Sequence, residues 1–510
     1  MMKGIDSMSK IKQFLDSKII KEDVGEETVL TWKETISYAL GRGAQGMSTS
    51  TMSASTVNYF LTNLLGIKPG TIANVRLWSG LWDAFNDPIM GVMVDKTHTK
   101  DGKMRPYIKY APYLCALFTA LTFFNSSGFP YILRLIFAII ALVGWDMTYT
   151  AFDIPMGALA FSITSSGVER TKLFGISSIV RAVAGALPGA IIPVALMFPY
   201  FETHTKGAYI TAAVIAFAGI ILFSRPTYYC TKERARHSEN EPTIKQCFSL
   251  LLKNRPLFML FLSNMAFLLV TARTSAYMYF AIDLVGSAKF YAILGVAGAP
   301  APFIAGVGVP WLVQKLGSKA DFKKLFIGCC LAAAIMHGLL FVVCGKPLME
   351  LEAGETPSIF VLILCMFFIF ASTIPIEFKN LLCKEMEAET VDYVEWKTGE
   401  RVEGIMLSLM SFTGKLTNSV SSTIALAILG IAGYVTHEDA VATAQSMNAK
   451  FALLSLESLV PMVGCLLMLV PIFFYNISRK DHDKMMSEIA QRRALKENTL
   501  KEELEDVSEV

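Results

Sequence analysis

The chain has 510 residues, of which 53% are hydrophobic and only 17% charged, and its mean hydropathy is +0.47. This composition excludes an ordinary soluble globule of that length and predicts an all-α membrane protein, because crossing the hydrocarbon core by helix takes roughly 20 mainly apolar residues. The formal net charge of +3 says little by itself, so the placement of the basic residues carries the argument about partners and orientation.

Twelve apolar stretches have the length of a membrane-spanning helix. They lie near residues 34–62, 70–95, 107–126, 130–163, 172–199, 207–225, 256–284, 290–314, 324–345, 357–380, 404–433 and 452–477. The most charged internal segment divides them into two groups of six, which is a two-bundle transporter layout. We therefore expect a cytoplasmic N-terminal segment (1–33), a first six-helix bundle (34–225), a cytoplasmic loop (226–255), a second bundle (256–477) and a charged cytoplasmic tail (478–510).

Basic residues gather in the even-numbered connections, counted from an N-terminus inside the cell. These connections hold Lys96, Lys100, Lys103, Arg105 and Lys109, the segment 225–255, Lys315, Lys319, Lys323 and Lys324, and finally Arg479, Lys480 and Lys484, whereas each odd-numbered connection holds one basic residue. This asymmetry predicts a multi-pass plasma-membrane (inner-membrane) protein with both termini cytoplasmic. Since the basic residues follow topology, nucleic acid is not an expected partner.

The second predicted span carries acids at its middle depth. Asp83, Asn86 and Asp87 stand three and four residues apart, so on a helix they share one face. An unpaired aspartate there costs at least ~2.5–3.5 kcal/mol, and Pro88 leaves the carbonyl of Ala84 without its helical donor. The cluster therefore predicts a site that needs a positive counter-ion.

The fourth span repeats this arrangement. Asp146, Tyr149 and Asp153 share a face, with Thr150 beside them and Pro155 one turn later. In the eleventh span, Lys415 is a buried cation that the acids could balance.

Two interpretations of these acids stay open. Fixed ion pairs could serve only helix packing, but several acids with two proline breaks favour a cation site. Na⁺ would take an oxygen cage that includes Asp83 and Asp87 as metal ligands. Protons are the competing ion, because crowded, desolvated carboxylates can load and release H⁺.

Four segments resemble the glycoside-pentoside-hexuronide:cation symporters, a branch of the major facilitator superfamily, and the chain looks like a divergent relative of the bacterial melibiose carrier. They are "WDAFNDPIMG", "TYTAFDIP", "NRPLFML" and "VDYVEWKTGERVEG". The resemblance implies the two-bundle major facilitator fold. It further implies a cation site at Asp83, Asn86, Asp87 and Thr150, sugar binding at Asp153, and a place for Lys415 in the shared cavity.

Departures from that family pattern point away from a galactoside. The first span offers only Arg42 and Gln45 where relatives often keep an acid, and Gly157 stands where melibiose carriers have an aromatic residue. Asp146 stands where relatives have glycine. We expect Asp146, Tyr149 and Asp153 to contact substrate, and we expect a carboxylate-bearing sugar such as a hexuronide to be held by three basic residues, which are Arg273, Lys415 and Arg181.

Two loops resemble the cytoplasmic latches of the superfamily. In "VDKTHTKDGKMRPY" the latch residues would be Asp95, Lys103 and Arg105, and in "VDYVEWKTGERVEG" they would be Glu395 and Arg401. Solvated surface charge is the plain alternative for both.

The leading functional prediction is Na⁺- or H⁺-coupled symport of a glycoside, pentoside or hexuronide by alternating access. A proton-coupled exporter of amphiphilic compounds and a non-transporting membrane sensor remain as alternatives. No nucleophile with a base, metal cage or phosphate loop is recognisable, so an enzyme is not expected. We expect no cofactor besides the coupling ion, a lipid bilayer around the chain, and a monomer.

Overall fold

The computed structural model describes residues 30–97, 99–164, 167–195, 197–198, 200–201, 204–233, 254–287, 289–298, 300–317, 321–398, 403–436, 443–489 and 491–492. In these residues the fold is helical, apart from one isolated bridge between Thr99 and Gly102. The predicted all-α class is confirmed, and each of the predicted apolar stretches overlaps one helix or a run of consecutive helical elements.

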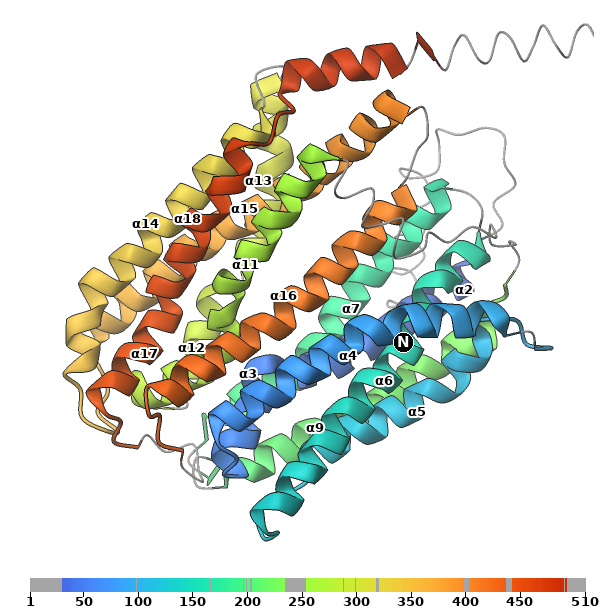
Figure 1. Cartoon of the computed structure of the whole chain (residues 1–510). Helices are drawn as coiled ribbons and strands as arrows, with labels where there is room; N and C mark the ends of the chain where they lie inside the picture. Colours follow the sequence, from blue (N-terminus) through green and yellow to red (C-terminus); the bar gives the residue numbers. More distant parts are fainter. Residues whose placement is uncertain are drawn as a thin grey trace, which may run out of the picture.

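The first half of the chain forms one group of helices (Figure 1). Its elements are α2 (Trp32–Thr51), α3 (Ala54–Tyr59), the π-helical turn η1 (Phe60–Leu64), α4 (Pro69–Lys96), α5 (Arg105–Thr122), α6 (Tyr131–Ile163), α7 (Gly167–Ala195) and α9 (Thr205–Cys230). Within it α2 packs against α7 and α9, and α5 packs against α6 and α9. We call this group the N-bundle.

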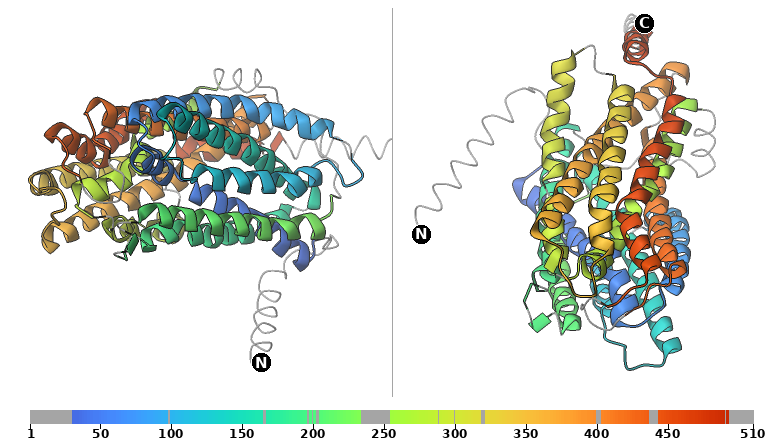
Figure 2. Two further views of the ribbon diagram at one scale, coloured as in Figure 1. Left: turned by 90° about the horizontal axis from the view of Figure 1, so that it is seen from below. Right: turned by 90° about the vertical axis from the view of Figure 1, so that its left-hand side faces the viewer.

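The second half forms the C-bundle, drawn from green to red in Figures 1 and 2. Its elements are α11 (Arg255–Tyr279), the π-helical turn η2 (Phe280–Leu284), α12 (Lys289–Gly298), α13 (Ala301–Leu316), α14 (Phe322–Met349), α15 (Ile359–Thr398), α16 (Glu403–Ile431), α17 (Met447–Glu457) and α18 (Leu459–Phe473). Here α14 packs against α15 and α18, and α11 packs against α16 and α18.

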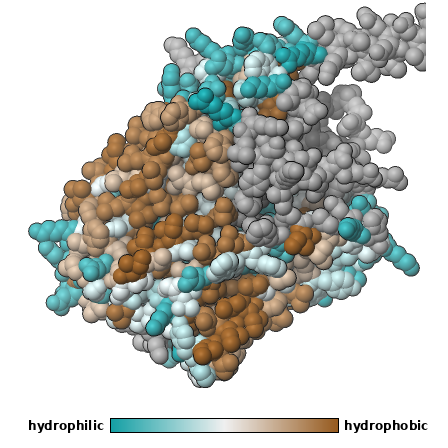
Figure 3. All heavy atoms as spheres, viewed as in Figure 1, coloured by the Kyte–Doolittle hydropathy of each residue, from teal (hydrophilic) through white to brown (hydrophobic). Residues whose placement is uncertain are grey.

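The outer surface fits a membrane environment. Six described helices are long and apolar enough to cross a membrane, or seven if the bent pair α17 and α18 counts as one span. Figure 3 shows hydrophobic residues gathered along the visible flanks of the helices and hydrophilic residues towards the ends. The helix α4 is not among the six, because Arg76, Asp83 and Asp87 lower its hydropathy. The chain is thus a multi-pass membrane protein.

The two bundles meet at one end of the molecule, which we call the closed end; it holds η1, η2 and the start of α4. The amide of Asn58 donates to Ser422 Oγ at 2.9 Å, and the amide of Asn63 donates to the Tyr434 hydroxyl at 3.0 Å. The hydroxyls of Thr62 and Tyr279 lie 2.6 Å apart. Each of these pairs joins the N-bundle to the C-bundle, so polar side chains fasten the bundles together here.

The helices α4 and α16 carry this contact towards the middle of the molecule. They run antiparallel: a Cβ on Gly430 would lie 3.3 Å from the backbone nitrogen of Gly70, and a Cβ on Gly80 would lie 2.0 Å from Ser419 Oγ. Between these points the Thr423 hydroxyl donates to the Ala73 carbonyl at 3.3 Å. Small residues let the two backbones approach closely, as in other membrane helix pairs.

An eight-residue pattern occurs once in each bundle at the closed end. The segment 59–66 reads "YFLTNLLG" and 279–286 reads "YFAIDLVG". Each contains a π-helical turn that is followed two residues later by a glycine with positive φ, +65° at Gly66 and +98° at Gly286. Glycine adopts this backbone conformation without steric cost. The rings of Tyr59 and Tyr279 pack edge to face, 5.1 Å between centroids, so the two copies meet each other at the contact between the bundles.

Candidate functional site

The acids of α4 are tied to α6. The Thr150 hydroxyl donates to Asp83 Oδ1 at 3.0 Å, and Thr150 is almost fully buried. Asn86 is 8% exposed, and its amide nitrogen has no hydrogen-bond partner. Asp87 follows on the same turn of α4. Two of the four predicted cation ligands, Asp83 and Thr150, therefore meet directly, and a third lies buried one turn along α4.

The set of possible ligands is mixed. Within the described part of the chain, no three His, Cys, Asp or Glu side chains lie close enough together to hold a metal. A cation bound to this cluster would therefore rely on amide and hydroxyl oxygens as well as on the carboxylates of Asp83 and Asp87.

Asp153 lies against α2. Gln45 donates to Asp153 Oδ1 at 3.0 Å, Arg42 Nη1 lies 3.3 Å from the same oxygen, and Arg42 also donates to Gln45 Oε1 at 2.5 Å. The side chains of Asp153 and Arg42 remain 35% and 22% exposed. The predicted sugar-binding acid thus forms a partly open cluster with the two polar residues of the first span.

Arg42 also lines an open groove of about 500 Å³ between α2 and α7. The predicted residue Arg181 lies on its α7 side, and the other lining residues are Gly46, Thr49, Ser50, Ser178, Ala182, Gly185 and Ala186. Gly46 sets the closeness of the two helices, since a Cβ there would stand 2.3 Å from the carbonyl oxygen of Arg181. Close packing therefore places two guanidinium groups, from Arg42 and Arg181, along one groove.

The remaining predicted residues of α6 make separate contacts. Asp146 accepts a hydrogen bond from the Ser79 hydroxyl. The ring of Tyr149 stacks on Trp145 with 5.1 Å between centroids, and the Trp145 indole donates to Ser48 Oγ at 2.9 Å. An aromatic pair therefore braces α6 against α2 close to Asp153.

Lys415 lies on α16, and its place follows from the register of that helix with α4. Because Gly80 meets Ser419 and the helices are antiparallel, the backbone of Lys415, one turn before Ser419, lies opposite the stretch of α4 that begins at Asp83. The register therefore places the backbone of Lys415 across the bundle contact from the start of the acidic stretch at Asp83.

Arg273 lies deep in the C-bundle. Its Nε is 3.4 Å from Oε1 of Glu457, the last residue of α17, and the side chains of the two residues are 13% and 1% exposed. Sequence reasoning placed Arg273 inside a span but missed its acidic partner. Charge within an apolar run, the signal that selected Arg273, also marks Glu457 and Arg76.

The predicted latch in the first half is fastened within the N-bundle. Three successive backbone N–H groups at the start of α5, those of Lys103, Met104 and Arg105, donate to the Glu233 carboxylate at 2.9–3.0 Å. The Arg105 guanidinium donates to the Tyr228 carbonyl at 2.8 Å. Carboxylates bind well at helix N-termini because the first amides lack partners there. Arg401 and the side chains of Asp95 and Lys415 lie outside the described residues.

The predicted latch in the second half, with Glu395 half-buried on α15, is covered by the tail. A helix over residues 479–489, the red helix across one end of Figures 1 and 2, follows α18. His482 Nε2 lies 2.9 Å from Asp392 Oδ2, and the Trp396 indole donates to Glu488 at 2.6 Å. The sequence assigned this tail no role; in the structure it packs on α15.

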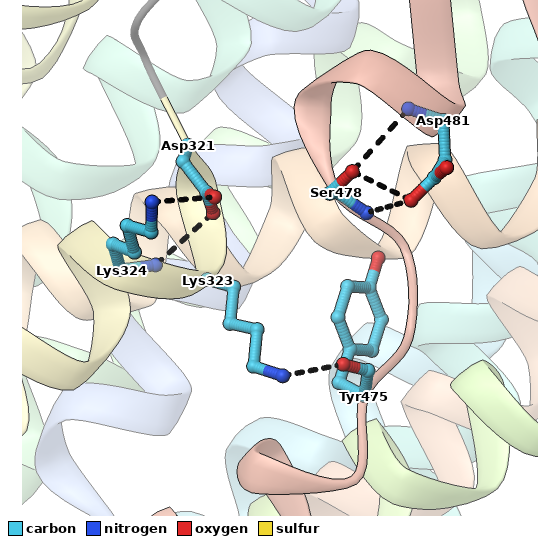
Figure 4. Close-up of polar contacts among 6 residues, drawn as sticks. All are labelled: Asp321, Lys323, Lys324, Tyr475, Ser478 and Asp481. Carbon is cyan, nitrogen blue, oxygen red and sulfur yellow. Dashed lines mark hydrogen bonds and ion pairs between the residues drawn. The ribbon is translucent and has the colours of Figure 1, made fainter. Parts of the chain in front are cut away.

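Two sets of contacts fix the tail helix, and Figure 4 shows the Lys323–Tyr475 bond of the first and the Ser478–Asp481 bonds of the second. Lys323 donates to the carbonyls of Phe473 and Tyr475 where α18 ends. At the start of the tail helix the Asp481 amide donates to Ser478 Oγ while the Ser478 amide donates to Asp481 Oδ2, a reciprocal cap. The Ser478 hydroxyl, bonded to the carboxylate, lowers the pKa of Asp481. The S-x-x-D spacing is the sequence signal that could have predicted this helix start.

Comparison with known proteins places this site in context. The family described as "MFS/sugar transport protein" matches residues 37–479. The isoprimeverose transporter of Lactiplantibacillus pentosus is 29% identical over 93% of this chain and 94% of its own length. The glucuronide carrier protein homolog of Escherichia coli (strain K12) is 24% identical over 92% of this chain and 98% of its own length.

Solved structures share the fold. A bacterial homologue of the iron transporter ferroportin superposes with a TM-score of 0.60 at 14% identity, covering 88% of this chain and the whole of that one. The nucleoside transporter NupG superposes with a TM-score of 0.56 at 12% identity, covering 87% of this chain and 99% of that one. At such low identity the likeness shows the transporter fold alone.

Proposed function

Because the chain belongs to the MFS/sugar transport protein family, we propose that it carries out cation-coupled symport of a sugar derivative by alternating access. Membership makes it a secondary transporter and not an enzyme. The observation that carries the cation-coupled proposal is the bond between Asp83 on α4 and Thr150 on α6, because one ion bound there would order two helices at once. The relatives' substrates, isoprimeverose and glucuronide, support a glycoside, pentoside or hexuronide.

The cation would occupy the cluster of Asp83, Asn86, Asp87 and Thr150. An amide and a hydroxyl oxygen contribute to the coordination of Na⁺ but add little to the binding of a proton, so this set favours Na⁺ over H⁺. With the ion absent, Lys415 across the bundle contact would balance the acids. With the ion bound, α6 is fixed by Thr150, and Asp153 lies one helical turn further along the same helix. Each ligand then raises the affinity of the other.

We propose that the substrate carries a carboxylate and lies in the groove between α2 and α7. Arg181 and Arg42 line that groove, and a guanidinium matches a carboxylate in two-pronged geometry. Both contacts of Asp153 with α2 use Oδ1, which leaves Oδ2 to accept a sugar hydroxyl. We assign carboxylate binding to Arg181 and Arg42 in preference to Arg273, because Arg273 already contacts Glu457.

The proposed orientation follows from the distribution of basic residues. With twelve spans and both termini in the cytoplasm, the closed end faces outwards. The polar fastening between Asn58, Asn63 and Thr62 and their partners then closes the outer path, and the structure corresponds to the inward-facing member of the transport cycle.

Exchange in proteoliposomes tests the proposal. We expect labelled glucuronide to exchange in a cation-stimulated manner, and Arg181→Gln to slow glucuronide exchange roughly 10- to 100-fold, the equivalent of about 1.5–3 kcal/mol for a hydrogen bond to a charged group. Exchange of a neutral glycoside should change little. Arg225→Gln is the matched control, since Arg225 lies outside the groove and contacts the exposed Tyr113.

A wild-type preference for the neutral glycoside that survives Arg181→Gln would refute the acidic substrate. No exchange of either sugar, with efflux of an amphiphilic dye, would refute sugar symport and support the exporter.

A further inference from the structure

A second set of buried polar groups lies in the C-bundle, apart from the α4 acids. It consists of Arg273 on α11, His337 on α14, and Ser455 and Glu457 on α17. His337 is fully buried and Glu457 is 1% exposed. Five of their polar side-chain atoms have no hydrogen-bond partner: Arg273 Nη1, both ring nitrogens of His337, Ser455 Oγ and Glu457 Oε1.

This concentration of unpaired atoms demands an explanation. Leaving one buried donor or acceptor unpaired costs about 1–3 kcal/mol, and native proteins leave few of them. The contact of 3.4 Å between Arg273 and Glu457 offsets part of the charge burial, but it fills none of these hydrogen-bonding positions. A dry structural ion pair would not require an unpaired histidine beside it.

The regular helical hydrogen bonding of the main chain is also interrupted at Glu457. Here α17 ends, and α18 continues at an angle of 41° to it. Pro461 cannot donate to the Glu457 carbonyl, which lies four residues earlier. The main chain of Glu457 lies beside the His337 ring, whose nitrogens have no partner within hydrogen-bond geometry. Broken helices at mid-membrane depth form ion sites in many transporters, because they expose backbone groups within the bundle.

We propose that Arg273, His337 and Glu457 form a hydrated proton-binding site in the C-bundle. One proton from water adds to the Glu457 carboxylate or the His337 ring and leaves again to water, with no other bond changed. Arg273 stabilises the deprotonated carboxylate, and the exposed part of its side chain provides contact with solvent. The chemistry suits a proton because the set offers donors and acceptors in equal measure, in contrast to the acids and neutral oxygens of α4.

Charged and titratable groups around Glu457 come from several helices. Arg273 of α11 acts electrostatically on the Glu457 carboxylate. The Glu457 carboxylate in turn acts on Tyr277 of α11 and Cys365 of α15, and His337 of α14 lies beside its main chain. The neighbouring acid Asp283 of η2 accepts instead from Tyr434. Arg273 is the one guanidinium among these described groups. Protonation of Glu457 would therefore chiefly weaken its contact with Arg273.

Any role of this proton in a transport cycle rests on the proposed function. Proton binding itself is tested separately. The purified full-length protein, without sugar or Na⁺, is titrated from acid to alkaline pH while infrared absorption of protonated carboxyl groups is recorded. We expect Glu457→Gln to remove one titrating carboxyl band, and His337→Gln to shift its midpoint by about one pH unit or more, the size at which two groups titrate together.

Glu389→Gln is the matched control, since Glu389 is also buried in the C-bundle but accepts from Tyr475 at 2.8 Å; it should leave the Glu457 band in place. Should Glu457→Gln fail to fold because Arg273 is left unpaired, the double variant Arg273→Gln with Glu457→Gln removes both charges and should lack the same band. The proposal is overturned if the wild-type protein shows no titrating carboxyl band that Glu457→Gln removes. It is also overturned if His337→Gln leaves the midpoint of that band unchanged. These results do not depend on whether Asp83 variants transport sugar.

Discussion

The two bundles share a frame but differ in the chemistry at their centres. At the closed end each contributes the same "YF" pattern and π-helical turn. Midway along the helices, the N-bundle holds acids beside amide and hydroxyl oxygens, and the Thr150 hydroxyl donates to Asp83. At the corresponding depth the C-bundle holds Arg273, His337 and Glu457. A duplicated scaffold therefore carries two unlike polar centres, which indicates a division of labour between the halves.

The sharpest test of this division is to neutralise one acid in each half. We expect Asp83→Asn to abolish the coupling between cation and sugar, an effect of roughly 5- to 150-fold on sugar affinity, because the carboxylate is the charged ligand of the cation. The matched variant Asp283→Asn, at the closed end of the C-bundle, should keep cation stimulation. Sugar binding at several Na⁺ concentrations measures both, and equal loss in the two variants would contradict the proposed location of the cation.

A second test separates packing from charge in the N-bundle. Gly46→Ala should destabilise the protein by about 1–3 kcal/mol, the usual range for overpacking, because the new methyl group would clash with the Arg181 carbonyl. Gly175→Ala on α7 meets nothing within 4 Å and should leave stability unchanged. Thermal unfolding of the two purified variants measures this difference. Equal melting temperatures for Gly46→Ala and Gly175→Ala would show that α2 and α7 separate easily.

The smallest effect is expected at the tail helix, which has no counterpart in the described part of the N-bundle. Ser478→Ala should weaken this helix by about 0.5–2 kcal/mol through loss of its cap. The pKa of Asp481 is lowered by the Ser478 hydroxyl, so its contribution is present at neutral pH and is lost as the pH falls through the acidic range. Hydrogen exchange of residues 479–489 measures both effects; protection that is independent of pH would exclude the reciprocal cap.

Much of the fold was predictable because hydropathy is a property of whole segments. The apolar stretches, the helical class and the family resemblance all follow from sequence. The π-helical turns were not predicted, since a single wider turn leaves the apolar pattern almost unchanged, and the matching "YF" segments are only eight residues long. The break after Glu457 had a signal in Pro461, but the proline alone does not indicate which way the helix turns.

The candidate site was predictable in its residues and less so in its pairings. Spacing along one helix placed Asp83, Asn86 and Asp87 together, and Thr150 meets Asp83 from α6. Contacts between distant helices depend on packing that a single sequence does not contain. For this reason Arg42 with Asp153, and Glu457 with Arg273, emerge only from the structure.

The repeated tyrosine pattern has one consequence for movement. Tyr59 and Tyr279 touch across the junction between the halves, so any rearrangement that admits solute from that side must pull these rings apart. A cysteine pair replacing Thr62 and Tyr279, whose hydroxyls lie 2.6 Å apart, could be joined by a short bifunctional thiol reagent, because a tyrosine hydroxyl reaches further from the backbone than a cysteine sulfur in a disulfide. Once cross-linked, the carrier should bind its cargo from one compartment and never release it into the other.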